Sequence, residues 1–236
     1  MAEEEPHPTV ERIRSALRAL ALPFSWPGEA LRRSRAAAAL RGQSAACARF
    51  DTRSWTAELL KHLEWRRFEE TCAAYFEALG FATHITPSRS GGGMDIGLCA
   101  AGTDTVDTIV HCKAWDAYRI GVKPLRELRA AMSAAGAREG IFVTSGLFTR
   151  EAAAYAGKES ISLIDGTAFF SKLAELPAQA AHDLLRFATE GDFLTPTCPS
   201  CAIKMVSRRS IQGGRPYWGC VNYPACKETL AETAPA

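Results

Sequence analysis

Long apolar runs are absent from this sequence. No uninterrupted stretch approaches the roughly 18 residues that a membrane-spanning helix needs. The first residues, MAEEEPHP, lack the basic-then-apolar order of a signal peptide. No internal repeat and no long low-complexity tract occurs either. These absences argue against a membrane partner and predict a cytoplasmic protein by default.

The net charge is also small, because 28 basic and 26 acidic residues leave a charge of only +2. That balance does not by itself indicate nucleic acid, but the distribution says more. Between residues 11 and 53, nine arginines stand against three acidic residues. This end could contact phosphate, or it could form a solvated pair of Arg- and Ala-rich helices. The two helices are expected over 8–22 and 28–46, separated by Pro23 and Pro27.

Helical and extended patterns alternate along the central part of the chain. Apolar residues at helical spacing predict one long helix from about Thr56 to Leu79. A strand, a hairpin and further alternating helices and strands follow, so the sequence predicts a mixed α/β sheet flanked by helices. The expected organisation is a basic helical extension (1–53), an α/β domain (54–190), a polar, Pro-bearing linker (191–197) and a small cysteine-rich module (198–230).

The stretch GGGMDIGLCAAGTDTVDTIVHCK (91–113) organises the α/β domain as a predicted hairpin. Because strand side chains alternate with a period of two, Asp95 points away from the apolar face of its strand. In the second strand, His111 and Lys113 share a face and Cys112 points the other way. An acid, an imidazole and an ammonium on one surface suit metal-assisted chemistry on a phosphate.

The C-terminal module carries four of the eight cysteines at metal-ligand spacing. Cys198 and Cys201 form a C-x-x-C knuckle, and Cys220 and Cys226 form a second pair. Four thiolates predict a closed structural zinc site, and such a short segment would depend on the metal to fold. The alternative for a C-x-x-C is a redox pair, which would not need the second pair.

Aromatic residues and arginines surround this predicted zinc site. Such a mixture suits stacking on unpaired bases next to phosphate contacts, although the aromatic rings could instead pack over the zinc knuckle. The segment, especially CPSC, the Met205-Val206 that follows, and YWGCVNYPAC, resembles the four-cysteine zinc fingers at the C-termini of bacterial type I topoisomerases. That resemblance implies DNA binding, mainly to single strands. The residues expected to contact DNA are Arg208, Arg209, Arg215, Tyr217, Trp218 and Tyr223.

Residues 65–165 resemble the Mrr-type restriction endonuclease domain of the PD-(D/E)xK nuclease superfamily. The matching pieces are WRRFEETCAAYFEALGF, SGGGMDIGL, IVHCKAW, GIFVTSGLFTREAAAYA and ISLIDG. The resemblance implies a restriction-endonuclease-like fold and maps the metal-binding aspartate to Asp95, the catalytic lysine to Lys113 and a helix glutamate to Glu69. Without the resemblance, the spacing of apolar residues would place Glu69 at the edge of its helix's apolar stripe, where most glutamates are solvated or paired on the surface. His111 departs from the glutamine or glutamate of the family pattern.

The family resemblance implies a divalent-metal-dependent endodeoxyribonuclease that acts on double-stranded DNA, leaves 5′-phosphate and 3′-hydroxyl ends, and restricts foreign or modified DNA. His111 could ligate the Mg²⁺ or Mn²⁺ ion, shifting preference towards Mn²⁺, or remain a hydrogen-bonded strand histidine. The second reading allows an alternative function, a DNA-binding protein on a degenerate nuclease fold. A homodimer would supply the two active sites that cutting both strands calls for.

Overall fold

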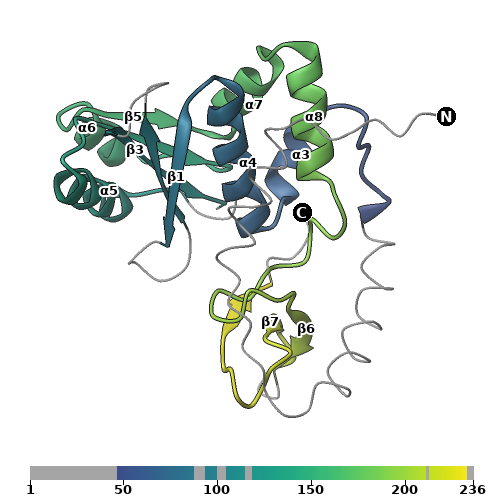
Figure 1. The fold of residues 1–236 in the computed structure, drawn as a ribbon. Helices are drawn as coiled ribbons and strands as arrows, with labels where there is room; N and C mark the ends of the chain where they lie inside the picture. The colour runs from purple at the N-terminus through teal and green to yellow at the C-terminus, as the bar shows by residue number, and fades with distance from the viewer. Residues whose placement is uncertain (1–46, 88–93, 100–104, 115–118, 211–212, 233–236) are drawn as a thin grey trace.

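The computed structural model describes residues 47–87, 94–99, 105–114, 119–210 and 213–232, and a five-stranded mixed sheet lies at its centre (Figure 1). Strand order is β1-β2-β3-β4-β5, with antiparallel pairing from β1 to β3 and parallel pairing from β3 to β5. The predicted mixed sheet is confirmed. The helices expected over 8–22 and 28–46 lie outside the described residues. The strands are β1 (Ala82–Pro87), β2 (Met94–Cys99), β3 (Val106–Lys113), β4 (Glu139–Thr144) and β5 (Ile161–Ile164).

Helices cover both faces of this sheet and create two separate cores. Alternation sends Val110 and Cys112 of β3 into a core beneath α3, α4, α7 and α8, and sends Ile109 into another core with α5 and α6. Figure 1 shows α5 and α6 grouped on one side, apart from α4, α7 and α8. Within the described ranges, no helix is both long and apolar enough to cross a membrane. The helices are α3 (Ala57–His62), α4 (Trp65–Ala78), α5 (Val122–Ala135), α6 (Arg150–Ala156), α7 (Gly166–Ala174) and α8 (Ala178–Ala188).

The long helix expected from Thr56 to Leu79 is in fact two helices, α3 and α4. Leu63 and Glu64 leave helical geometry, with ψ angles of 127° and 154°. The Glu64 N–H donates to the carbonyl of Phe193 instead of to α3 (2.9 Å). Its carboxylate then caps α4 by accepting from the N–H of Arg66 (3.0 Å). Apolar spacing continues across the break, which is why periodicity alone indicates one helix.

The cysteine-rich module is a separate three-stranded antiparallel sheet with the order β6-β7-β8. Its buried hydrophobic core consists of Cys198, Met205 and Cys220, with Trp218 and Leu230 partly buried against them. So small an apolar core needs another source of stability. In Figure 1 the module lies below the part of the domain formed by α3, α4 and α8. Its strands are β6 (Val206–Arg209), β7 (Pro216–Gly219) and β8 (Thr229–Ala231).

Candidate functional site

The β2–β3 hairpin places Asp95 directly opposite His111. Asp95 Oδ1 and His111 Nε2 lie 2.8 Å apart, and the two side chains are 18% and 6% exposed. Both project from the sheet face that carries α5 and α6, because their neighbours Ile96 and Val110 enter the opposite core. The ring of Phe142, from β4, meets the imidazole edge-on with the ring centroids 6.2 Å apart. The structure thus brings together two of the predicted site residues and adds an aromatic neighbour that holds the imidazole.

The contact between these two atoms is short, yet Nε2 of His111 makes no hydrogen bond of acceptable geometry. A buried ring nitrogen without a hydrogen bond is costly unless something else binds it. Neighbouring ligand atoms around one octahedral Mg²⁺ lie about 3 Å apart, since each is about 2.1 Å from the ion. The spacing of Oδ1 and Nε2 and the unsatisfied nitrogen therefore fit two ligands of one divalent cation.

Lys113 follows His111 on the same face of β3, two residues along the strand. Its backbone is held by β4, because its carbonyl accepts hydrogen bonds from Thr144 Oγ1 (2.8 Å) and from the N–H of Ser145 (3.4 Å). Thr144 Oγ1 also accepts from the N–H of Gly146 (3.1 Å). Thr144 is fully buried. No sequence pattern marks this threonine as functional, since it ends an apolar run that is typical of an ordinary buried strand.

Glu69 reaches the sheet from α4 and is only 2% exposed. It lies beside Cys72, where burial, together with the thiol of Cys112 and the charge of Glu69, raises the pKa of the Cys72 thiol well above its usual value. Cys112 belongs to the core opposite the face of His111. Among the described residues, Glu69 does not join Asp95 and His111 in a cluster of three ligand atoms. A metal-binding function for Glu69 therefore stays a prediction.

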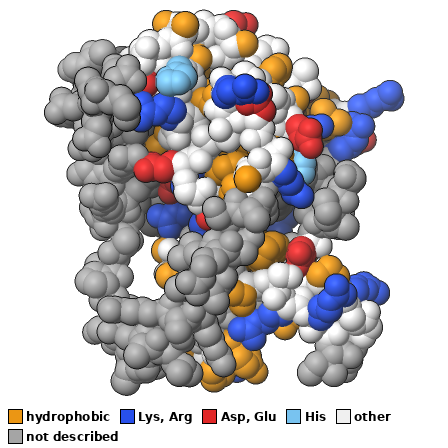
Figure 2. Space-filling model, turned by 90° about the vertical axis from the view of Figure 1, so that its right-hand side faces the viewer, with side chains coloured by type: hydrophobic (Ala, Val, Ile, Leu, Met, Phe, Trp, Pro, Cys, Tyr) orange, Lys and Arg blue, Asp and Glu red, His pale blue; other side chains and the backbone are white. Residues whose placement is uncertain are grey.

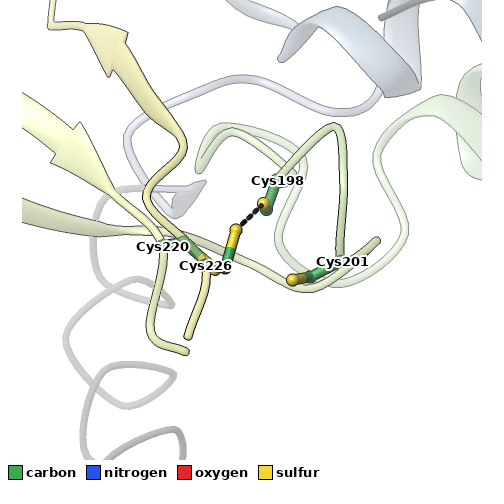
Figure 3. A group of neighbouring side chains, drawn as sticks. All are labelled: Cys198, Cys201, Cys220 and Cys226. Atoms are coloured by element: carbon green, nitrogen blue, oxygen red, sulfur yellow. Dashed lines mark hydrogen bonds between the residues drawn. The ribbon is translucent and has the colours of Figure 1, made fainter. Parts of the chain in front are cut away.

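The four cysteines of the C-terminal module converge on one point (Figure 3). All four sulfurs lie within 4.8 Å of one another, and Cys198 Sγ is 3.8 Å from Cys226 Sγ. Four thiolates at about 2.3 Å from a tetrahedral zinc ion would lie about 3.8 Å apart. Burial raises the pKa of the Cys198 and Cys220 thiols. The sulfur arrangement and the small core fit a structural zinc ion held by Cys198, Cys201, Cys220 and Cys226.

Two of the predicted DNA-contacting side chains form a pair on the surface of this module. The guanidinium of Arg208 stacks over the ring of Tyr223 at 5.5 Å, and Arg208 Nη2 donates to the carbonyl of Cys220 (3.2 Å). The Tyr223 side is open, since that residue is 61% exposed. Trp218 instead packs against the metal-binding core. This agrees with the alternative in which the aromatic rings pack over the zinc knuckle.

The remaining predicted contacts lie nearby. Arg209 and Arg215 are exposed and Tyr217 is half-buried in β7. Figure 2 shows several Lys and Arg side chains on the lower body of the molecule, where the module lies. A cationic surface with one exposed, Arg-stacked aromatic ring can hold phosphate and offer a stacking platform to a base.

Comparisons with known proteins match both parts of the chain. The profile of the restriction endonuclease family matches residues 60–173, and that of the topoisomerase DNA binding C4 zinc finger matches residues 195–234. An uncharacterized protein, y4cE, of Sinorhizobium fredii (strain NBRC 101917 / NGR234) is 32% identical over 115 residues, which cover 48% of this chain and 29% of that protein. The chain therefore spans less than a third of the length of that curated relative.

A solved structure of the MspJI restriction endonuclease in complex with a 27-mer oligonucleotide is also similar. It shares 18% sequence identity and a TM-score of 0.36, over 58% of this chain and 33% of that chain. The sheet topology and the family match both agree with the predicted architecture.

Proposed function

We propose that this chain, which joins a restriction endonuclease domain to a topoisomerase-type C4 zinc finger, is a metal-dependent endonuclease that hydrolyses phosphodiester bonds in DNA. The observation that carries this proposal is the 2.8 Å contact between Asp95 Oδ1 and His111 Nε2, on the sheet face shared with Lys113. Two converging ligands with an ammonium along the same strand are a suitable set for metal-assisted attack on a phosphate.

Each side chain of the site has a distinct task in this proposal. Asp95 and His111 would hold the divalent cation, which when bound neutralises phosphate charge and lowers the pKa of a water molecule. Lys113 stabilises the negative charge that develops on the phosphoryl oxygens in the transition state. Thr144 fixes the backbone of Lys113 through the 2.8 Å hydrogen bond. Glu69, supplied by α4, would be a further acidic group of the site.

The choice of metal follows from the ligands. An imidazole nitrogen is a softer donor than a carboxylate oxygen and a poorer ligand for Mg²⁺. We therefore expect Mn²⁺ to support faster cleavage than Mg²⁺ at equal concentration. Structural zinc on the four cysteines would provide folding free energy to the finger and take no part in the chemistry.

The finer aspects of the function are also proposals. The nuclease domain (54–190) would act on double-stranded DNA and the finger (198–230) would bind DNA, including single strands, through Arg208, Tyr223 and the neighbouring cations. Restriction of foreign or modified DNA in the cytoplasm is the proposed biological role. A homodimer would provide the two active sites that a double-strand break calls for.

A plasmid assay tests the proposed function directly. Supercoiled DNA, unmodified or methylated, is incubated with the full chain and either Mg²⁺ or Mn²⁺. Nicking should be lost in both Asp95→Ala and Lys113→Ala, and it should persist in Lys158→Ala, which removes an exposed lysine elsewhere on the same domain. Undiminished nicking by Asp95→Ala would overturn the assignment of the metal site.

A second candidate function rests on His111, which stands where the family pattern has glutamine or glutamate. In that case the chain binds DNA on a nuclease fold without cutting it, and the zinc finger carries the activity. Salt-dependent DNA retention with no cleavage in either metal, on all the substrates above, would favour this alternative.

A further inference from the structure

The zinc finger is joined to the nuclease domain by a buried carboxylate, Glu64. The Glu64 side chain is 2% exposed and accepts a hydrogen bond from Lys204 Nζ of the finger at 3.0 Å. It also accepts from Thr197 Oγ1 (2.9 Å) and from the Thr197 N–H (3.2 Å). The fourth donor is the N–H of Arg66, in the first turn of α4. A buried charge requires such complete pairing, and removing one partner leaves the other charge uncompensated.

Further hydrogen bonds tie the same segment to the start of α4. Trp65 Nε1 donates to the carbonyl of Thr197 (2.7 Å), and Lys204 Nζ donates also to the carbonyl of Thr195 (2.8 Å). Phe193, Thr195 and Thr197 are 2%, 3% and 5% exposed. A segment that composition marks as a linker is therefore packed into the joint between the two domains.

The donors that reach Glu64 are arranged by the zinc-binding knuckle itself. Thr197 immediately precedes the ligand Cys198, and it forms a β-bridge with Lys204. Between them the knuckle closes on itself, since the Cys198 N–H donates to the carbonyl of Ile203 (2.8 Å) and the Ala202 N–H donates to the carbonyl of Cys198 (2.9 Å). Metal binding by this loop would therefore fix Thr197 and Lys204, the two residues from this side of the joint that donate to the Glu64 carboxylate.

We propose that Glu64 is a positioning residue that locks the zinc-loaded finger to the nuclease domain as one rigid body. The finger surface of Arg208 and Tyr223 then stays at a constant position relative to Asp95 and Lys113. Zinc in turn stabilises the first turn of α4, because Thr197 and Lys204, on either side of the knuckle, supply three of the four donors to its capping carboxylate. The joint is independent of the proposed function; its consequence for where DNA is cut rests on that function.

The experiment compares the mobility of the two domains in the full, zinc-loaded chain by ¹⁵N relaxation. Wild-type finger and nuclease amides should report one common rotational correlation time. In Lys204→Met the finger amides should report a shorter time than the nuclease amides, while metal analysis still finds one zinc per chain. Lys227→Met is the matched control, because it removes an exposed lysine of the same finger. Lys204→Arg keeps the charge and should retain the common correlation time.

Hydrogen exchange gives a second measurement at defined atoms. The amide protons of Arg66 and Thr197 both donate to Glu64. Their exchange should be at least about tenfold faster in Lys204→Met, and removing zinc with a chelator should accelerate exchange at Arg66, outside the finger. If Lys204→Met does not fold, Glu64→Gln is measured instead, since glutamine keeps the acceptor oxygen and the volume but not the charge.

Two results would overturn the proposal: separate correlation times in the wild-type chain, or Lys204→Met and Glu64→Gln behaving like Lys227→Met. Neither readout depends on cleavage, so a chain without nuclease activity can still confirm the joint. If the nuclease is active, Lys204→Met should spread the cut positions on an end-labelled duplex without abolishing nicking. If the finger is mobile in Lys204→Met but the cut positions are unchanged, the joint is confirmed and its effect on cleavage is rejected.

Discussion

Replacing His111 with glutamate would place two carboxylates where an imidazole and a carboxylate now meet. The two ligand atoms lie 2.8 Å apart on side chains that are 6% and 18% exposed. Two full negative charges at that separation repel by about 6 kcal/mol at an effective permittivity of about 20. Keeping one carboxyl protonated at pH 7 costs less, about 4 kcal/mol, because that pH lies about three units above the ordinary pKa of a carboxyl. The metal-free variant should therefore take up a proton at this site instead of holding both charges.

The cost in stability has a defined dependence on pH. The folded variant holds a carboxyl whose pKa lies above its unfolded value, so the stability contributed by that proton is present at low pH and is lost as pH rises through the raised pKa. The free energy of unfolding should fall below that of the wild type by about 4 kcal/mol at pH 7 but only by about 1.4 kcal/mol at pH 5. Mg²⁺ should remove the difference, because a divalent cation replaces the shared proton and carboxylates are its preferred ligands.

Thermal unfolding followed by circular dichroism, in EDTA or in Mg²⁺, measures this effect. Each kcal/mol moves the Tm of a chain of this size by about 2–4 °C, so the variant in EDTA should melt about 8–16 °C below the wild type at pH 7 and about 3–6 °C below it at pH 5. His84→Glu is the matched control, since His84 is exposed on the same face of the edge strand β1. The shared metal site is refuted if His111→Glu matches this control at both pH values and does not respond to Mg²⁺.

Three further predictions concern the finger and the support of Lys113. Cys220→Ser should lower bound zinc from one per chain to none in protein purified without chelator; a variant that retains zinc would contradict the four-cysteine site. Tyr223→Ala should weaken binding of a single-stranded oligonucleotide about 5- to 150-fold, measured by fluorescence anisotropy, because stacking of one base contributes about 1–3 kcal/mol. Tyr223→Phe keeps the ring and should bind nearly as well as the wild type. Equal affinities of the alanine and phenylalanine variants would argue against stacking. Thr144→Val should lower the free energy of unfolding by about 1–3 kcal/mol in chemical denaturation, because the Lys113 carbonyl keeps only the weaker hydrogen bond from the Ser145 N–H. Wild-type stability of this variant would mean that the 2.8 Å hydrogen bond contributes nothing.

Short sequence patterns predicted those features of the molecule that a few neighbouring residues determine. Strand alternation is set within a few residues, so it correctly placed Asp95 and His111 on the face of the hairpin opposite Ile96 and Val110. The cysteine spacing likewise predicted a cluster that the fold brings within 4.8 Å. The contact of Asp95 with His111 and the support from Phe142 and Thr144 were beyond such reasoning. They depend on the register of β2 and β4 against β3, which whole strands determine together.

The break at Glu64 shows why the joint between the two domains could not be predicted. Its position in an amphipathic stretch is that of an ordinary exposed helix residue, and the polar composition of 191–197 is that of an ordinary linker. Polar groups that are satisfied by protein and polar groups that are satisfied by water look the same in a sequence. Here two partners of the Glu64 carboxylate lie 133 and 140 residues away, at Thr197 and Lys204. Glu64 lies at the end of one helix, caps the next and binds Thr197 and Lys204, so the helix break and the domain joint depend on the same residue.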